Sequence, residues 1–213
     1  MSMWVLIYIC AFLAFFSVVE MVKRFRDLRP EFTRKVVHIG SCLLIFTMPW
    51  FLNKWEVMLL ALAFIVLLLF TRVYGLFSAV QGVKRKTIGE FTFPMGAALS
   101  AYFFLPEQPH AFQVGFLVLA FSDSLAEFVG RRMPMWSANI LGGAKSVGGS
   151  VAFLFSTLII LIVGVHWWGV EVNYLKLAMG CAAITAVEFS QVFGIDNLFI
   201  PVSTCVIWEW MSL

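Results

Sequence analysis

Charged residues are scarce in this chain. Only 13% of its 213 residues are Asp, Glu, Lys or Arg, whereas 62% are hydrophobic. Soluble globular domains carry about a quarter charged residues, so this composition excludes that class. The long uncharged stretches show continuous apolarity rather than strand-like alternation, which is typical of helices within lipid. The composition therefore predicts an all-α, polytopic integral membrane protein.

Cysteine pairs and metal-binding spacings are also missing. The four cysteines lie in apolar stretches, with no CxxC pair and no histidine at metal-binding spacing, so we expect them to be small buried hydrophobic residues. The net charge of +3 is too small to indicate a nucleic-acid partner. The chain enters an apolar stretch at Met3 without the basic region and cleavage site of a signal peptide, so we expect the first span to be retained.

Eight apolar segments can be marked, and no linker rich in serine or proline divides them. They cover approximately residues 3–22, 36–52, 55–72, 91–105, 111–130, 147–168, 174–192 and 198–212. A helix perpendicular to the membrane needs roughly 20 apolar residues, so the shorter segments are expected to tilt or insert only partly. We therefore expect a single membrane-embedded domain over residues 1–213, with seven or eight transmembrane helices.

The basic residues predict how the chain is oriented. All but two of the fifteen lysines and arginines lie between the first and second, third and fourth, or fifth and sixth spans. Cytoplasmic loops carry an excess of Lys and Arg, so these connections are expected to face the cytoplasm and the N-terminus to lie outside. The lack of a transit sequence suits a prokaryotic plasma membrane.

Acidic residues within the apolar segments converge on the same predicted face. Asp123 and Glu127 are four residues apart, so both carboxylates lie on one helix face near the cytoplasmic end of the fifth span. Glu188 lies near the end of the seventh span, Asp196 just after it, and Glu90 at the start of the fourth. A buried carboxylate costs several kcal/mol unless it is paired or binds a metal, so we expect one shared site.

Cations and glycines follow the first two acids along the chain. Arg131 and Arg132 end the fifth span, and a glycine-rich stretch leads through Lys145 into the sixth. Acids for a metal, cations for phosphate and N–H donors at a helix start are what phosphoryl chemistry requires. The stretch is not a Walker A motif, because GxxxxGK[ST] is absent, and its glycines could instead permit close helix packing.

Four blocks resemble the polyprenol kinase family, which includes phytol, farnesol and dolichol kinases and is related to the CTP-using diacylglycerol kinases. They resemble the family's RK-x-x-H, GE-x-x-x-P, D-x-x-A-[DE]-x-x-G-R-R with K-S-x-x-G-S, and T-x-x-E with DN-x-x-x-P patterns. The blocks are RKVVHIG (34–40), GEFTFPMG (89–96), SDSLAEFVGRR with KSVGGS (122–132 and 145–150) and TAVEFSQVFGIDNLFIP (185–201). The chain departs from the family at Ile195, where many members have an acid, and at Gly148, where some have Glu.

The resemblance implies CTP-dependent phosphorylation of a membrane isoprenoid alcohol at the cytoplasmic face. The site would be built from helix ends and loops around 34–40, 84–96, 122–150 and 185–201. A cytidylyltransferase similar to CDP-diacylglycerol synthase, or a CTP-dependent diacylglycerol kinase, would need a similar site. A small transporter is less favoured, because no internal repeat occurs and the polar residues cluster on one side. The sequence does not decide between CTP, ATP and UTP.

Each candidate residue has an expected role. The candidate catalytic residues are Asp123, Glu127, Lys145 and His38. The candidate Mg²⁺ ligands are Asp123, Glu127 and Asp196, since hard cations prefer oxygen ligands. The candidate nucleotide- or phosphate-binding residues are Arg34, Lys35, Arg131, Arg132, Gly142, Gly143, Ser146, Gly149, Ser150 and Asn197. Glu90 and Glu188 are expected to support the site, with Glu90 orienting Lys84, Arg85 or Lys86.

Structural roles remain open for the same residues. Asp123 and Glu127 could each pair with Arg131, Arg132 or Lys145 simply to make burial tolerable. Arginines at a cytoplasmic helix end are also ordinary topology signals, and a lone histidine at the end of a span is often a satisfied structural residue.

Overall fold

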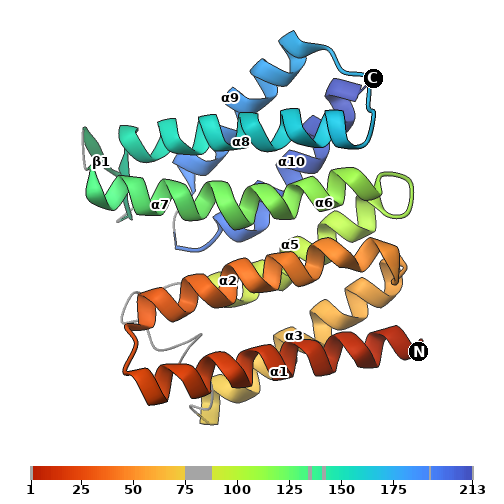
Figure 1. Cartoon of the computed structure of the whole chain (residues 1–213), viewed down its shortest axis with the longest axis vertical. Coiled ribbons are helices and arrows are strands. Elements are labelled where there is room, and N and C mark those ends of the chain that lie inside the picture. The colour runs from red at the N-terminus through yellow and green to blue at the C-terminus, as the bar shows by residue number, and fades with distance from the viewer. Residues whose placement is uncertain (1, 75–87, 134–135, 141–142, 192, 213) are drawn as a thin grey trace.

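The computed structural model describes residues 2–74, 88–133, 136–140, 143–191 and 193–212. These residues are almost entirely helical, which confirms the predicted all-α class (Figure 1). The helices are α1 (Met3–Arg26), α2 (Pro30–Thr47), α3 (Lys54–Tyr74), α5 (Gly89–Phe104), α6 (Pro109–Leu117), α7 (Asp123–Arg132), α8 (Val147–Trp167), α9 (Tyr174–Ser190) and α10 (Asp196–Ser212). A 3-10 turn, Met48–Trp50, follows α2, and a π-helical segment, Val118–Ser122, joins α6 to α7 without a break.

Four helices are long and apolar enough to cross a membrane. They are Met3–Arg26, Lys54–Tyr74, Pro109–Arg132 (α6, the π-helical segment and α7 together) and Val147–Trp167. The other predicted segments also fold as helices, α2, α5, α9 and α10, but these have only 16 to 18 residues. At 1.5 Å per residue they span about 24–27 Å, less than the roughly 30 Å hydrocarbon core. Seven or eight spans and an outside N-terminus thus remain predictions.

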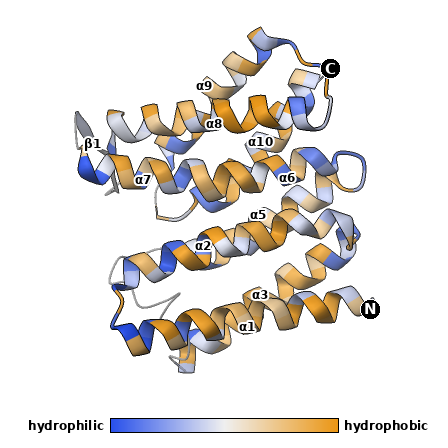
Figure 2. Cartoon of the chain, viewed as in Figure 1, coloured by the Kyte–Doolittle hydropathy of each residue, from blue (hydrophilic) through white to orange (hydrophobic). Residues whose placement is uncertain are grey.

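The composite helix of α6, the π-helical segment and α7 lies at the centre of the bundle. Figure 1 shows it between α2 and α8, and it also contacts α10. Its π-helical segment is the most enclosed part, because Val118, Leu119, Ala120 and Ser122 are fully buried. Hydrophilic residues colour the ends of α1, α2 and α7 that lie nearest the strand β1 (Figure 2). The polar end of the central helix is therefore enclosed by parts of the chain distant in sequence.

A short hairpin, which the sequence did not predict, precedes α8. Strand β1 (Ser137–Ile140) pairs antiparallel with β2 (Gly143–Ser146), and Ser137 lies opposite Ser146. Four-residue strands are too short for an alternating pattern to stand out. Ser146 then caps α8, because its hydroxyl oxygen accepts the Gly149 N–H at 3.1 Å. The hairpin and cap fix Lys145, which immediately precedes this capping residue.

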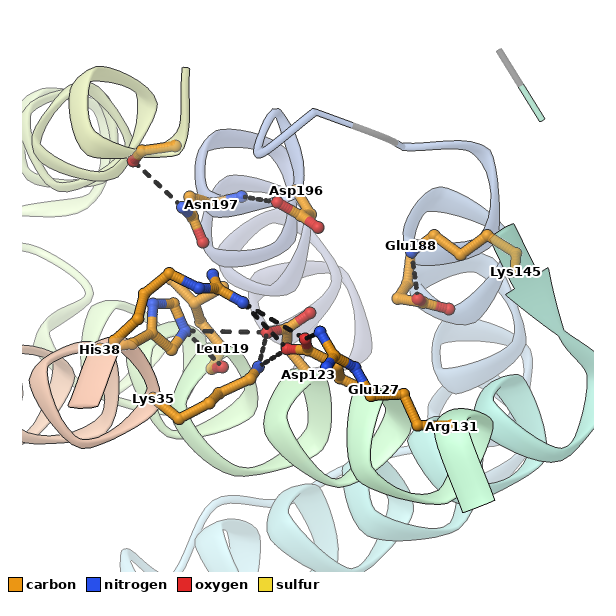
Figure 3. A network of polar contacts seen from close by, with 12 residues as sticks. Lys35, His38, Leu119, Asp123, Glu127, Arg131, Lys145, Glu188, Asp196 and Asn197 are labelled. Atoms are coloured by element: carbon orange, nitrogen blue, oxygen red, sulfur yellow. Dashed lines mark hydrogen bonds and ion pairs between the residues drawn. The ribbon is translucent and has the colours of Figure 1, made fainter. Parts of the chain in front are cut away.

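A glycine fixes where α10 begins. A Cβ at Gly96 of α5 would lie 2.5 Å from the carbonyl oxygen of Asn197. Any side chain there would push the start of α10 away from α5, since main-chain atoms cannot yield as a flexible side chain can. The close approach brings Asp196 and Asn197 to the same end of the bundle as the acids of α7 (Figure 3).

Candidate active site

The π-helical segment sets the direction of the two acids on α7. The Asp123 N–H bonds to the carbonyl of Val118, five residues back, rather than to that of Leu119, four residues back. One extra residue in a turn rotates the following helix by about 100° relative to a continuous α-helix. Asp123 and Glu127 consequently form a stripe whose carboxylates meet the side chains of α2.

Lys35 of α2 bridges these two acids (Figure 3). Its Nζ lies 3.0 Å from Asp123 Oδ2 and 2.6 Å from Glu127 Oε2. Two arginines also reach Glu127: Arg34 Nη2 lies 3.3 Å from Oε1, and Arg131 donates to the same oxygen. The structure thus joins the blocks that begin at Arg34 and at Ser122, and Glu127 is shared by three cations.

His38 lies one turn beyond Arg34 on α2. Its Nε2 is 3.3 Å from the carbonyl oxygen of Leu119 and 3.8 Å from Asp123 Oδ2. The ring packs against Phe93 of α5, with ring centroids 5.5 Å apart. The imidazole is therefore held at the π-helical segment, next to Asp123 but not within hydrogen-bond distance of it.

Lys145 and Glu188 form a second acid–cation pair. Lys145 on β2 donates to Glu188 in the last turn of α9, and only 5% of the Glu188 side chain is exposed. The second oxygen of Glu188 and the hydroxyl of Ser150 are buried without a hydrogen-bond partner among the described residues. Figure 3 shows this pair to one side of the Lys35 bridge, and the charge of Lys145 acts on Asp123 at longer range than a contact, so we group the two pairs together.

Asp196 and Asn197 begin α10, and the two side chains make different contacts. Asn197 Nδ2 donates to the Gly89 carbonyl at 3.1 Å, so this amide ties α10 to α5. Asp196 Oδ1 accepts the main-chain N–H of Asn197 at 3.0 Å. Asp196 has no ion-pair partner within the described ranges, and it interacts electrostatically with Asp123. Figure 3 shows these residues on the opposite side of the view from α7.

Some candidate residues lie apart from these contacts. The Arg132 guanidinium covers the Phe128 ring, 3.9 Å from its centroid, on α7 itself. Glu90 pairs with Arg72 of α3 at 2.5 Å. The residues that Glu90 was expected to orient, Lys84, Arg85 and Lys86, lie outside the described residues, and so does Gly142.

The glycine-rich stretch contributes to helix packing. A Cβ at Gly149 would lie 2.9 Å from the Ala126 carbonyl oxygen, so glycine lets α8 approach α7. Its N–H is already bonded to the Ser146 hydroxyl. Gly143 pairs with Ile140 in the hairpin. Gly149 therefore has the helix-packing role that was the alternative to phosphate binding, and phosphate binding by this stretch stays a prediction.

We call the eight charged residues at this end the acid–cation cluster. Its cations and carboxylates balance in number, and they are Arg34, Lys35, Arg131 and Lys145 with Asp123, Glu127, Glu188 and Asp196. No three His, Cys, Asp or Glu side chains among the described residues gather in a group that could hold a metal by themselves. Mg²⁺ is usually held by one or two carboxylates plus substrate phosphates, so Mg²⁺ binding by Asp123, Glu127 and Asp196 stays a prediction.

This chain is similar to known proteins, in one case over most of its length and in another over less than half of it. It is 26% identical over 194 residues to a phytol kinase from Synechocystis sp., covering 88% of this chain and 82% of that protein. It is 37% identical over 92 residues to an uncharacterized protein from Rickettsia prowazekii, covering 42% of this chain and 43% of that protein. No family model matches the chain, and no solved structure matches it significantly. The chain is thus distantly similar to a phytol kinase along most of its length.

One component of the site was missed by sequence reasoning. The Leu119 carbonyl that contacts His38 is a main-chain group, and it is available because of the π-helical segment. No pattern in the sequence distinguishes this segment from ordinary helix. The sequence indicated Arg131, Arg132 or Lys145 as the partner of Asp123, whereas the structure pairs it with Lys35.

Proposed function

We propose that this protein is a membrane kinase that transfers the γ-phosphate of CTP to an isoprenoid alcohol of the phytol, farnesol or polyprenol type. The acid–cation cluster at one end of an apolar helical bundle is the observation that carries this proposal. The similarity to a phytol kinase over 88% of the chain supports the same reaction class. We place the site at the cytoplasmic face of a prokaryotic plasma membrane, where a nucleotide and a lipid hydroxyl can meet.

The balanced charge of the cluster bears on how a nucleotide would bind. A triphosphate carries about four negative charges, and four carboxylates already offset the four cations. Divalent cations would therefore have to accompany the nucleotide. Asp123 and Asp196 are the carboxylates best placed to hold Mg²⁺, which would neutralise charge on the phosphate oxygens. We assign Glu127 instead to holding the three cations that contact it.

The cations retain donors for phosphate oxygens. Each guanidinium has five N–H groups, so Arg34 and Arg131 have more donors than the single carboxylate of Glu127 can accept. Both side chains are partly exposed, at 32% and 57%. Lys145 would contribute a further ammonium group after exchanging Glu188 for phosphate. These groups would hold the donor nucleotide in place for an in-line attack.

An apolar surface for the lipid lies on the same helix as the acids. Phe121, Leu125 and Phe128 follow one another at helical spacing on the composite helix and are each at least two-fifths exposed. At about 100° per residue this face lies on roughly the opposite side of the helix from Asp123 and Glu127, which turn toward Lys35. An isoprenoid chain lying along it would share the depth of the acids, and its hydroxyl would have to pass around the helix to meet them.

The reaction itself is simple in its atoms. The alcohol oxygen forms a bond to the γ-phosphorus, the bond to the β–γ bridging oxygen breaks, CDP leaves, and the alcohol proton passes to a carboxylate of the cluster, for which Asp123 is the candidate. Phosphoryl transfer usually passes through a loose transition state, so positioning and electrostatic stabilisation contribute most of the catalysis. The cluster would provide both, with its cations facing the transferred group.

Isotopic labelling tests the proposal. Purified protein in lipid nanodiscs receives Mg²⁺ and CTP labelled at the γ- or the α-phosphate, with phytol, farnesol, a long polyprenol, diacylglycerol or phosphatidic acid. We expect γ-label to move to an isoprenoid alcohol, and ATP and UTP offered in parallel define the donor. Transfer to diacylglycerol would correct the substrate, whereas α-label on phosphatidic acid would replace the kinase by a cytidylyltransferase.

A further inference from the structure

The carbonyl of Leu119 has lost its usual main-chain partner. In a continuous α-helix it would accept the N–H of Asp123, but that N–H bonds to Val118 instead. His38 Nε2 lies 3.3 Å from this oxygen. A side chain of α2 therefore takes the place of a main-chain hydrogen bond inside the central helix.

This contact determines which nitrogen of His38 carries the proton. A carbonyl oxygen only accepts hydrogen bonds, so Nε2 must donate and the neutral ring has its lone pair at Nδ1. The nitrogen nearest Asp123 is this same protonated Nε2, at 3.8 Å. Lys35 already supplies the positive charge beside Asp123, so the ring has no need to become charged. With its proton on Nε2, the ring cannot accept a proton at the nitrogen nearest Asp123.

We propose that His38 is a positioning residue that locks the π-helical segment and thereby the direction of Asp123 and Glu127. Phe93 holds the ring in place, and only 10% of the His38 side chain is exposed. The consequence for catalysis rests on the proposed function; the structural role does not. This role differs from the catalytic one expected from the sequence.

Loss of the His38 donor would favour a return to continuous α-helix. The Asp123 N–H could then bond to Leu119, which satisfies the buried carbonyl. This change would rotate α7 by about 100° and carry Asp123 and Glu127 away from Lys35. The locking contact therefore decides between two registers of the same helix.

Three variants separate positioning from proton transfer. The amide nitrogen of Gln reaches approximately as far as imidazole Nε2, that of Asn only as far as Nδ1, and Leu has no donor. We expect His38→Gln to keep kcat within about tenfold of the wild type, whereas His38→Asn and His38→Leu lose about 100-fold. His110→Gln and His166→Gln are controls, because neither histidine contacts the cluster. Equal activity or equal inactivity of the three His38 variants would overturn the proposal.

A spectroscopic measurement tests the same contact without relying on catalysis. With ¹⁵N-histidine-labelled protein in nanodiscs, the signal lost in His38→Gln identifies His38. We expect a proton on Nε2 at neutral pH, and a ring protonated only on Nδ1 would overturn the inference, because its Nε2 could not donate to Leu119. If the wild type phosphorylates none of the alcohols, the proposed function fails while this spectrum still decides the role of His38.

Discussion

Lys35 and Asp123 are 88 positions apart in the sequence, yet Lys35 Nζ lies 3.0 Å from Asp123 Oδ2. Because the same ammonium group also contacts Glu127 at 2.6 Å, one lysine links α2 to both acids of α7. This bridge joins the basic residues of α2 and the acids of α7 in a single polar cluster. Its removal is the most direct way to ask whether the cluster is needed for folding, catalysis or both.

Lys35→Met should destabilise the protein and abolish turnover. It leaves two largely buried carboxylates facing each other without their shared cation, and breaking a buried pair on one side costs about 3–5 kcal/mol. Because both partners retain some exposure, we expect a value near 3 kcal/mol. Denaturant or thermal unfolding in detergent measures the loss.

The matched double variant separates the two effects. Adding Asp123→Asn to Lys35→Met removes one of the opposed charges, so part of the stability should return while turnover stays absent. Strictly additive losses of stability would show that Lys35 and Asp123 do not interact in the folded protein.

Lys145→Ala should abolish turnover and weaken CTP binding. The variant removes the proposed phosphate contact, and it also leaves Glu188 as an unpaired, buried carboxylate. Lys145→Ala with Glu188→Gln relieves this burial cost, so the pair should regain stability without activity. Lys176→Ala is the control, since Lys176 lies in the first turn of α9, away from Glu188 in its last turn. Wild-type rates for Lys145→Ala would remove Lys145 from the mechanism.

Gly149→Ala should weaken the packing of α8 on α7. The new Cβ would lie 2.9 Å from the main-chain oxygen of Ala126, and overpacking of this kind costs about 1–3 kcal/mol. Val151→Ala is the comparison, because Val151 is exposed on the same helix. Equal thermal midpoints for the two variants in nanodiscs would mean that α8 can move away from α7 without loss of stability.

Removal of Mg²⁺ should weaken CTP binding rather than only slow the reaction. The charges of the described cluster are balanced, so the triphosphate needs an added cation to bind; we expect EDTA to raise the Kd for CTP at least about tenfold. Equilibrium dialysis with labelled CTP measures this change. Asp196→Asn should raise the Mg²⁺ concentration required, whereas Asp27→Asn, at the exposed end of α1, should not. CTP binding that is unchanged by EDTA would contradict the proposed role of the ion.

Much of this arrangement could be predicted because hydropathy and helical spacing act locally. Continuous apolarity indicated the helices, and the spacing of Asp123 and Glu127 placed both acids on one face. Arg131 was among the residues expected to pair with Glu127, because it lies four residues further along the same helix.

The remaining features depend on tertiary structure. Lys35 meets Asp123 only because α2 packs against the composite helix, and no local pattern states which helices pack. The π-helical segment was missed because a single wide turn does not alter the composition of an apolar span. The hairpin before α8 was missed because its strands have only four residues each.

The most direct test of the central claim is product analysis by ³¹P NMR with wild-type protein and Asp123→Asn, using the alcohol that accepts label. The wild type should release CDP and lipid monophosphate in equal amounts. Asp123→Asn should form neither above background while remaining folded, and Asp27→Asn should match the wild type. Pyrophosphate with a CDP-lipid, or full turnover by Asp123→Asn, would contradict the assignment of a phosphoryl-transfer site to this cluster.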